Sequence, residues 1–202
     1  MNRRNLLLAT LTAAALVPGG AVAALAPTPR QSQGPFYPDR LPLDRDNDLV
    51  QVEGREGLAS GEITHLTGRV LDRSGKPISG ALVEIWQCDA NGRYIHSRDA
   101  GGPPRDPGFQ GYGRFETGAD GGYRFRTIKP VPYPGRAPHI HMAVRLQGQP
   151  VLVTQIYVEG APENDQDWLL NNAEDPAALI VPFRPIEAPD ATLAANFDLV
   201  LG

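Results

Sequence analysis

The chain has 202 residues, of which 41% are apolar and 21% are charged, and its formal net charge is −4. This composition supports one folded domain with a hydrophobic core. It excludes a disordered chain and, without any cluster of Lys and Arg, a nucleic-acid-binding surface. The 22 glycines and 20 prolines favour short strands joined by turns over a helical bundle.

The first 23 residues have the pattern of an export signal. Arg3 and Arg4 precede an apolar run at 6–17, and the small residues at 21–23 form an A-x-A cleavage site. The apolar run is too short to span a bilayer, so no membrane span is predicted. The paired arginines favour the twin-arginine route, with the general secretory route as the alternative. We therefore expect an exported protein that is periplasmic or secreted.

Two further regions follow the predicted signal. Residues 24–61 are rich in Pro, Asp and Arg and lack a sustained hydrophobic period, which predicts an extended arm lying on the domain. Residues 62–202 show no internal repeat or linker and are predicted to form one domain. Cys88 is the only cysteine, which excludes an intramolecular disulfide, and it is expected to be a buried hydrophobic residue.

The predicted domain consists of short β-like runs separated by turns about every ten residues. Helix is expected to be scarce, with one short turn near 164–172. Two long connections, 88–113 and 129–138, interrupt the pattern and both contain tyrosine, and long loops on a β scaffold commonly carry function. The pattern predicts an all-β fold, an antiparallel β-sandwich with long active-site loops. The predicted strands lie at 66–72, 80–87, 113–117, 121–128, 139–146, 151–158 and 195–201.

His139 and His141 stand two residues apart in the predicted strand at 139–146, so their side chains share one face. The alternate residues are apolar and are expected to face the core. Imidazole nitrogen suits Zn, Cu, Ni or Fe. A tyrosine nearby, Tyr133, adds a harder oxygen donor, which favours ferric iron. A solvent-exposed histidine pair and a Zn or Cu site remain alternatives at this point.

Several separate motifs together resemble the intradiol ring-cleavage dioxygenases, a family that includes protocatechuate 3,4-dioxygenase and catechol 1,2-dioxygenase. The resemblance covers residues 34–160. It implies a transthyretin-like β-sandwich that holds a non-haem Fe(III), and cleavage of a catechol-type diol with O2 to a cis,cis-muconate-type diacid. The motifs are GPFYPD, LTGRVLDRSGKPISGALVEIWQCDANGRY, GYGRFETGADGGYRFRTIKPVPYPGRAPHIH and TQIYVEG, in the family's order.

The resemblance also implies a role for individual residues. The metal ligands would be Tyr94, Tyr133, His139 and His141. Tyr133 would be the axial ligand that leaves when substrate binds, while Tyr94 stays.

Three more residues are candidates for the reaction itself. Arg136 would bind substrate and stabilise negative charge that develops on its ring, and Gln155 would lie near the oxygen-binding side. Tyr112, in the GYGRF motif, is a candidate residue of the substrate pocket. The other residues considered are given structural roles: Trp86, Tyr123 and Tyr157 are expected to be packing residues, and the acidic residues at 163–167 a solvated loop.

Two features depart from the familiar members of the family. Only five residues separate Tyr133 from His139, where the best-known members have a longer loop that shapes the substrate site. The identity of the diol is therefore left open. The export signal is the second departure, because the familiar members are cytoplasmic, and it suggests an exported subgroup.

A non-catalytic binding module is the main competing interpretation. The run LTGRVLDRSGKPISGALVEIW by itself also resembles transthyretin-like β-sandwich modules that have no catalytic activity. A small aromatic diol and O2 are the partners that the dioxygenase interpretation requires. A homo-oligomer and a monomer are both compatible with the sequence.

Overall fold

The computed structural model of the chain describes residues 23–42, 44–99 and 102–202. The predicted export signal lies outside these residues except for its last position, Ala23. Within the described ranges, no helix combines the length and the apolar character needed to cross a membrane.

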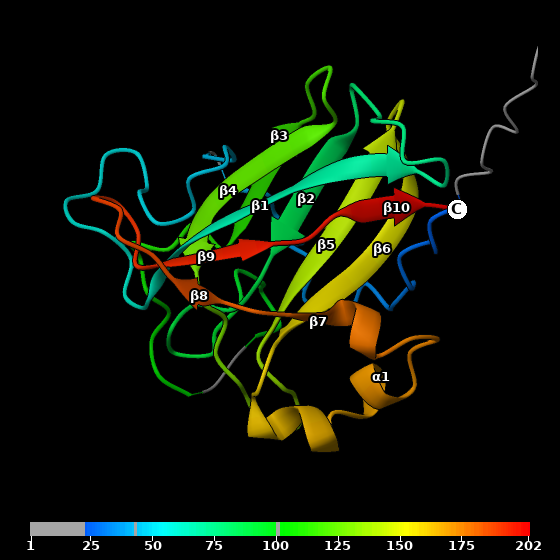
Figure 1. Cartoon of the computed structure of the whole chain (residues 1–202). Coiled ribbons are helices and arrows are strands. Elements are labelled where there is room, and N and C mark those ends of the chain that lie inside the picture. Colours follow the sequence, from blue (N-terminus) through cyan, green and yellow to red (C-terminus); the bar gives the residue numbers. More distant parts are fainter. Residues whose placement is uncertain (1–22, 43, 100–101) are drawn as a thin grey trace, which may run out of the picture.

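Ten strands of the described residues form two five-stranded sheets, and Figure 1 shows β1, β9 and β10 lying in front of β2, β5 and β6. In the first sheet β1 pairs with β4, β9 and β10, and β9 also pairs with β8; the second sheet has the order β3-β2-β5-β6-β7. The first sheet comprises β1 (Ile63–Asp72), β4 (Gly122–Ile128), β8 (Arg184–Pro185), β9 (Leu193–Asn196) and β10 (Leu199–Leu201). The second comprises β2 (Leu82–Trp86), β3 (Tyr112–Glu116), β5 (His139–Leu146), β6 (Gln149–Val158) and β7 (Ile180–Val181).

The prediction of an all-β sandwich is confirmed, but the expectation of purely antiparallel pairing is wrong. β1 pairs in parallel with β9 and β10, and β6 pairs in parallel with β7. The single strand predicted at 195–201 is broken at Phe197, between β9 and β10. There the Phe197 carbonyl accepts a hydrogen bond from the Tyr123 hydroxyl, and the Phe197 N–H donates to the Thr67 carbonyl. These partners are distant in sequence, so the local pattern could not reveal the break.

The hydrophobic core lies between the two sheets. Successive side chains of a strand lie on opposite faces, so alternate residues of each strand enter the core. On β5 these are Ile140, Met142 and Val144, which are fully buried. Tyr123 is part of this core, as predicted. Other strands contribute Leu66 and Val70 of β1, Val83 and Ile85 of β2, and Phe125 of β4.

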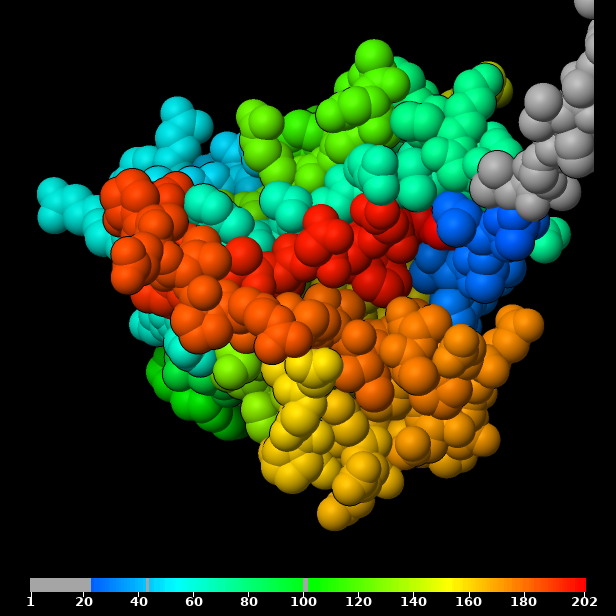
Figure 2. Space-filling view, viewed as in Figure 1, coloured from blue at the N-terminus to red at the C-terminus, as the bar shows by residue number. Residues whose placement is uncertain are grey.

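The N-terminal arm runs along β6, and the blue residues beside the red C-terminal strand in Figure 2 are its first part. The Gln31 N–H donates a hydrogen bond to the Val153 carbonyl at 2.9 Å. The Thr154 hydroxyl donates to the Pro29 carbonyl at 2.7 Å. These contacts place the first part of the arm at the edge of β6, and further along the arm Phe36 and Tyr37 pack on the outer face of the second sheet.

Helix is scarce in the described residues, as expected. A 3-10 helix, η1 (Pro162–Gln166), and a single turn of α-helix, α1 (Trp168–Asn171), follow β6, which confirms the short helical turn predicted near 164–172. A second 3-10 helix, η2 (Ala177–Leu179), precedes β7. Figure 1 shows α1 beside one end of the second sheet, where the chain returns to β7.

Gly68 on β1 offers a test of how closely the strands pack. A Cβ atom at Gly68 would lie 1.8 Å from the Phe197 carbonyl oxygen, which is held in the backbone. Gly68→Ala should therefore lower the free energy of unfolding by about 3 kcal/mol, measured by urea denaturation. Gly118→Ala is the control, because a Cβ there meets only the Asp120 side chain, at 3.3 Å. Equal stability of the two variants would contradict this close approach.

Candidate metal centre and substrate pocket

Four side chains meet on the outer face of the second sheet. His139 and His141 are the first and third residues of β5, so both imidazoles point away from the core. Tyr94 comes from the connection between β2 and β3, and Tyr133 from the connection between β4 and β5. The two long loops expected from the sequence thus bring their tyrosines to the histidine pair.

The other three donor atoms lie close to the Nε2 atom of His139. The Nε2 atom of His139 lies 3.1 Å from the Tyr94 hydroxyl oxygen, 3.5 Å from the Tyr133 hydroxyl oxygen and 3.2 Å from the Nε2 atom of His141. Ligands that bind one ion at about 2 Å are themselves roughly 3 Å apart. The spacing of the four donors therefore fits a single metal ion.

Hydrogen bonding and stacking fix the orientation of both imidazoles. The Nδ1–H of His139 donates to the Ala137 carbonyl at 2.7 Å, which leaves the Nε2 lone pair free to bind a metal. The His141 ring stacks on Trp86, with centroids 4.9 Å apart and planes 7° from parallel. Trp86 is buried as predicted, and in addition its ring supports the His141 imidazole.

Burial sets the ionisation of the donors. Loss of hydration, together with the charge of Arg136, lowers the pKa of His139 to about 4. Loss of hydration and the neighbouring His139 lower the pKa of His141 well below its ordinary value. Both rings are thus neutral at neutral pH, the form that binds metals. Burial also raises the pKa of the Tyr94 and Tyr133 phenols, so a strongly charged cation is needed to ionise them.

The arm closes one side of this centre. The Phe36 ring stacks on Tyr94 at 5.1 Å between centroids. Gly34 lies directly over His141: it has a φ of +72°, and a Cβ atom there would come within 3.1 Å of the imidazole. Glycine is therefore required at this position both for its backbone conformation and for the close approach. The alternative of a solvent-exposed histidine pair is wrong, because the arm and loops bury both rings.

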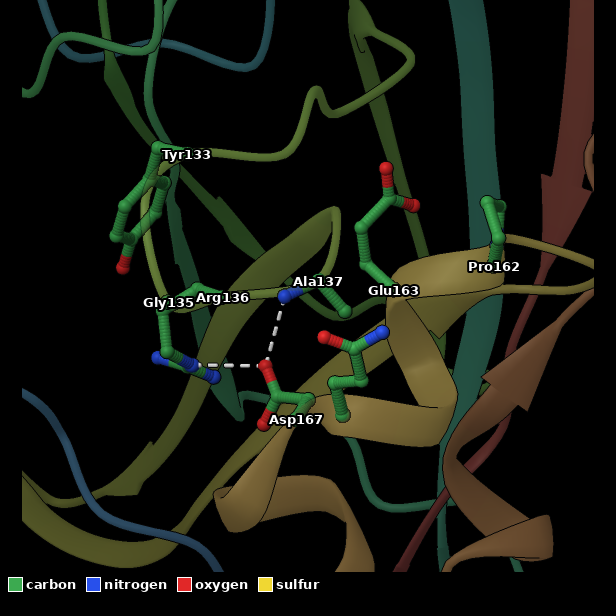
Figure 3. A pocket seen from close by; sticks show the side chains of 8 residues that line it. Tyr133, Gly135, Arg136, Ala137, Pro162, Glu163 and Asp167 are labelled. Carbon is green, nitrogen blue, oxygen red and sulfur yellow. Dashed lines mark hydrogen bonds and ion pairs between the residues drawn. The ribbon is translucent and has the colours of Figure 1, made fainter.

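The opposite side of the centre opens into a cavity. Tyr94, His139 and His141 are each at most 3% exposed, whereas Tyr133 is partly exposed. A cavity of about 330 Å³ begins at Tyr133 and reaches the 3-10 helix η1 (Figure 3). The side chains that matter for its chemistry are Tyr133, Arg136, Glu163, Gln166 and Asp167.

Arg136 links the cavity to β6 through its guanidinium group. Its Nη2 donates to the Gln155 side-chain oxygen at 2.7 Å and lies 3.2 Å from the Tyr157 hydroxyl oxygen. Its Nε donates to Asp167 at 2.9 Å. The structure therefore places the two predicted catalytic residues, Arg136 and Gln155, in direct contact beside Tyr133. Tyr157, assigned only to packing from the sequence, belongs to the same network.

Asp167 is the residue of this network that the sequence interpretation missed. It is buried, which opposes ionisation, but hydrogen bonds from Leu170, Ala137 and Arg136 outweigh that effect and hold the pKa of its carboxyl below its usual range. Its Oδ2 accepts from the Ala137 N–H at 2.8 Å, and its Oδ1 caps α1 by accepting from Leu170 at 3.0 Å. The prediction of a solvated loop at 163–167 is wrong for this residue. An Asp before a helical turn was a visible capping signal, but its partner Arg136 is 31 residues away.

Tyr112 does not line this cavity. It lies opposite Trp86 in the β2–β3 pair, is buried, and donates a hydrogen bond to Glu84 at 2.6 Å. Glu84 also forms an ion pair with Arg145 at 2.7 Å and accepts a hydrogen bond from Tyr37 of the arm. The structure thus gives Tyr112 a part in anchoring the arm, in place of the predicted contact with substrate.

Comparison with known proteins decides the family. Residues 32–202 match the family model described as Dioxygenase. A Burkholderia cepacia protein named protocatechuate 3,4-dioxygenase beta chain is 40% identical over 164 residues, which cover 70% of this chain and 69% of that protein. This chain belongs to the intradiol ring-cleavage dioxygenases.

Other members of the family are similar over much of the chain. Catechol 1,2-dioxygenase from Candida albicans is 29% identical over 187 residues, 83% of this chain and 58% of that protein. The solved dioxygenase domain of a dioxygenase carbohydrate-binding fusion from Streptomyces sp. SirexAA-E is 36% identical, with a TM-score of 0.67, and covers 87% of this chain and 98% of that chain. The chain spans about half the length of several other curated dioxygenases that it matches.

The family prediction made from the sequence is confirmed. The family match extends from residue 32 to the last residue, whereas the resemblance to transthyretin-like modules is confined to 66–86. Membership of the intradiol dioxygenases therefore favours an enzyme over a non-catalytic binding module.

The Asp167–Arg136 pair predicts a large effect on stability. Asp167→Ala would leave the mostly buried Arg136 guanidinium without its counter-ion and remove the α1 cap, so the free energy of unfolding should fall by about 3 kcal/mol in urea denaturation. Glu62→Ala, which removes an exposed ion pair with Lys129, is the control and should cost less than about 1 kcal/mol. Equal losses in the two variants would show that the Asp167 pair is not a special constraint.

Proposed function

We propose that this chain is a non-haem Fe(III) dioxygenase that cleaves a catechol-type diol with O2, between its two hydroxylated carbons, to a cis,cis-muconate-type diacid. The observation that carries this proposal is that two phenol oxygens and the Nε2 atom of His141 all lie 3.1–3.5 Å from the Nε2 atom of His139. The relatives named for protocatechuate and catechol support the choice of substrate class.

Tyr94, Tyr133, His139 and His141 are the residues that would hold the iron. Two phenolates and two neutral imidazoles suit a hard trivalent cation, whereas zinc sites in proteins are built mainly from Cys, His and carboxylate ligands. A bound ferric ion would act as a Lewis acid that ionises the phenols and activates the chelated diol. Metal analysis separates this proposal from the Zn or Cu alternative.

The chain's own residues would orient the substrate and accept its hydroxyl protons. Tyr133 borders the cavity and is the most exposed donor, so its phenolate oxygen can accept a proton from an incoming diol hydroxyl. Asp167 and Gln155 hold the Arg136 guanidinium in place, so its Nη1 N–H groups, which have no protein partner among the described residues, can donate to negative charge that develops on the substrate. The arm over His141 excludes water from the other side.

Tyr133→Phe tests the proposed proton acceptor. The variant keeps the ring but loses the oxygen, so kcat for catechol, measured by oxygen uptake, should fall about 100-fold or more. Tyr112→Phe is the matched control: it also removes one buried phenol oxygen, but one that points at Glu84, and should retain activity. Full activity of Tyr133→Phe, or equal loss in both variants, would contradict the assignment.

The visible spectrum tests the metal independently of turnover. The purified protein should show a broad tyrosinate-to-iron absorption band that shifts to longer wavelength when catechol is added without oxygen. Removal of iron with a chelator should abolish the band, and Tyr94→Phe should weaken it. A colourless protein fully loaded with zinc would overturn the iron proposal.

We propose in addition that the protein is exported by the twin-arginine route, because Arg3 and Arg4 precede the short apolar run. Replacing both residues with Lys keeps the charge but removes the paired arginines. The variant should accumulate as precursor in the cytoplasm, measured by cell fractionation and immunoblotting, whereas Arg30→Lys should be exported normally. Undiminished export of the doubly substituted protein would instead indicate the general secretory route.

A further inference from the structure

The cavity beside Tyr133 borders both a candidate metal ligand and Arg136. Tyr133 is the donor that is partly exposed, and it lines this cavity together with Arg136. A second cavity, of about 410 Å³, borders Tyr94 and His96 but touches neither Tyr133 nor Arg136, and Tyr94 is only 3% exposed. The cavity of about 330 Å³ is at the small end of the range for ligand pockets, which suits one substituted aromatic ring.

The charges that line this cavity do not cancel. Arg136 and Asp167 form an ion pair at 2.9 Å, so their charges offset one another. Apart from Tyr133, whose phenolate charge would be shared with a bound cation, the remaining charged group is Glu163 of η1, which Figure 3 shows across the cavity from Tyr133. Glu163 forms no ion pair within the described part of the chain. The cavity therefore has a surplus negative charge that faces any molecule entering it.

Arg136 is not free to compensate for that charge. Arginine binds carboxylates best through two parallel N–H donors. Here Nε is taken by Asp167, and Nη2 is taken by the side-chain oxygen of Gln155. Only Nη1 has no protein partner among the described residues. A ring carboxylate therefore could not form the bidentate pair of hydrogen bonds with Arg136.

We propose that Glu163 makes this cavity selective for diols whose ring substituent is neutral or cationic, and that it rejects diols carrying a ring carboxylate. The inference rests on the proposed function, because it takes the cavity as the diol site. A carboxylate entering the cavity would lose hydration, face the Glu163 carboxylate and find no paired arginine donors. This chain would thus differ in preference from its Burkholderia cepacia relative, which is named for protocatechuate, a carboxylated diol.

Two diols of nearly equal size separate charge from shape. 3,4-Dihydroxybenzoate carries a carboxylate, and 3,4-dihydroxybenzamide replaces it with a neutral amide. Their affinities for the iron-loaded protein are measured without oxygen by titration calorimetry, so no turnover is needed. The amide should bind wild type about tenfold more tightly than the acid, a preference of the size that one nearby charge produces in a partly hydrated site.

Variants of η1 assign the preference to one residue. Glu163→Gln should bring the ratio of the two affinities close to one, and Glu163→Lys should reverse it. Comparing each variant with wild type cancels the intrinsic chemical difference between the two diols. Asp165→Asn is the matched control: it removes the same charge from the same 3-10 helix, but from an exposed residue that does not line the cavity. Its ratio should equal that of wild type.

The outcomes distinguish the selectivity from the proposed function. An unchanged ratio in Glu163→Gln, or an equal shift in Asp165→Asn, overturns the role of Glu163 even if oxygen is consumed. The expected shift in binding without oxygen uptake by any diol leaves the selectivity standing and overturns the dioxygenase activity. Failure of every diol to bind overturns both.

Discussion

The strand β5 is buried on both faces, and the rest of the site depends on this constraint. One face supplies Ile140, Met142 and Val144 to the core, while the other presents His139 and His141 to the candidate metal centre. A shift of pairing by one residue would exchange the two faces and place imidazoles in the core. The central position of β5, paired on both sides by β2 and β6, fixes the register against such a shift.

The register of β5 also selects the neighbours of the candidate metal centre. Trp86 of β2 stands opposite His141, where it stacks on the imidazole. On the other side Gln155 pairs with His141, and Tyr157 pairs with His139. The side chains of Gln155 and Tyr157 contact the Arg136 guanidinium. The register of β5 therefore determines both which residue stacks on His141 and where the guanidinium lies beside the cavity.

The features that could be predicted from the sequence are those that depend on residues close together in the chain or on complete family motifs. The alternation of His139 and His141 with apolar residues predicted one face toward the core and both imidazoles on the other, and the family motifs supplied Tyr94, Tyr133 and Arg136. Asp167 escaped notice because its role comes from a contact with Arg136 across 31 residues, and a run of acidic residues ordinarily faces solvent. The parallel pairing of β9 and β10 with β1 escaped for the same reason, since nothing local specifies it. Tyr112 was misplaced because a family motif gives the position of a tyrosine but not the direction of its hydroxyl.

The arm has a consequence for the order in which the molecule assembles. Its contacts join residues far apart in sequence. The Gln155 side-chain amide donates a hydrogen bond to the Ser32 carbonyl, 123 residues away, and Gly34 lies against the His141 ring. Contacts between such distant segments form slowly and late, because a long loop must close before they contribute any stability. The sheets can therefore form before the arm covers the histidines. The arm is thus synthesised before the sheets but takes its place after them, and until it does, the candidate metal centre lacks its cover over His141.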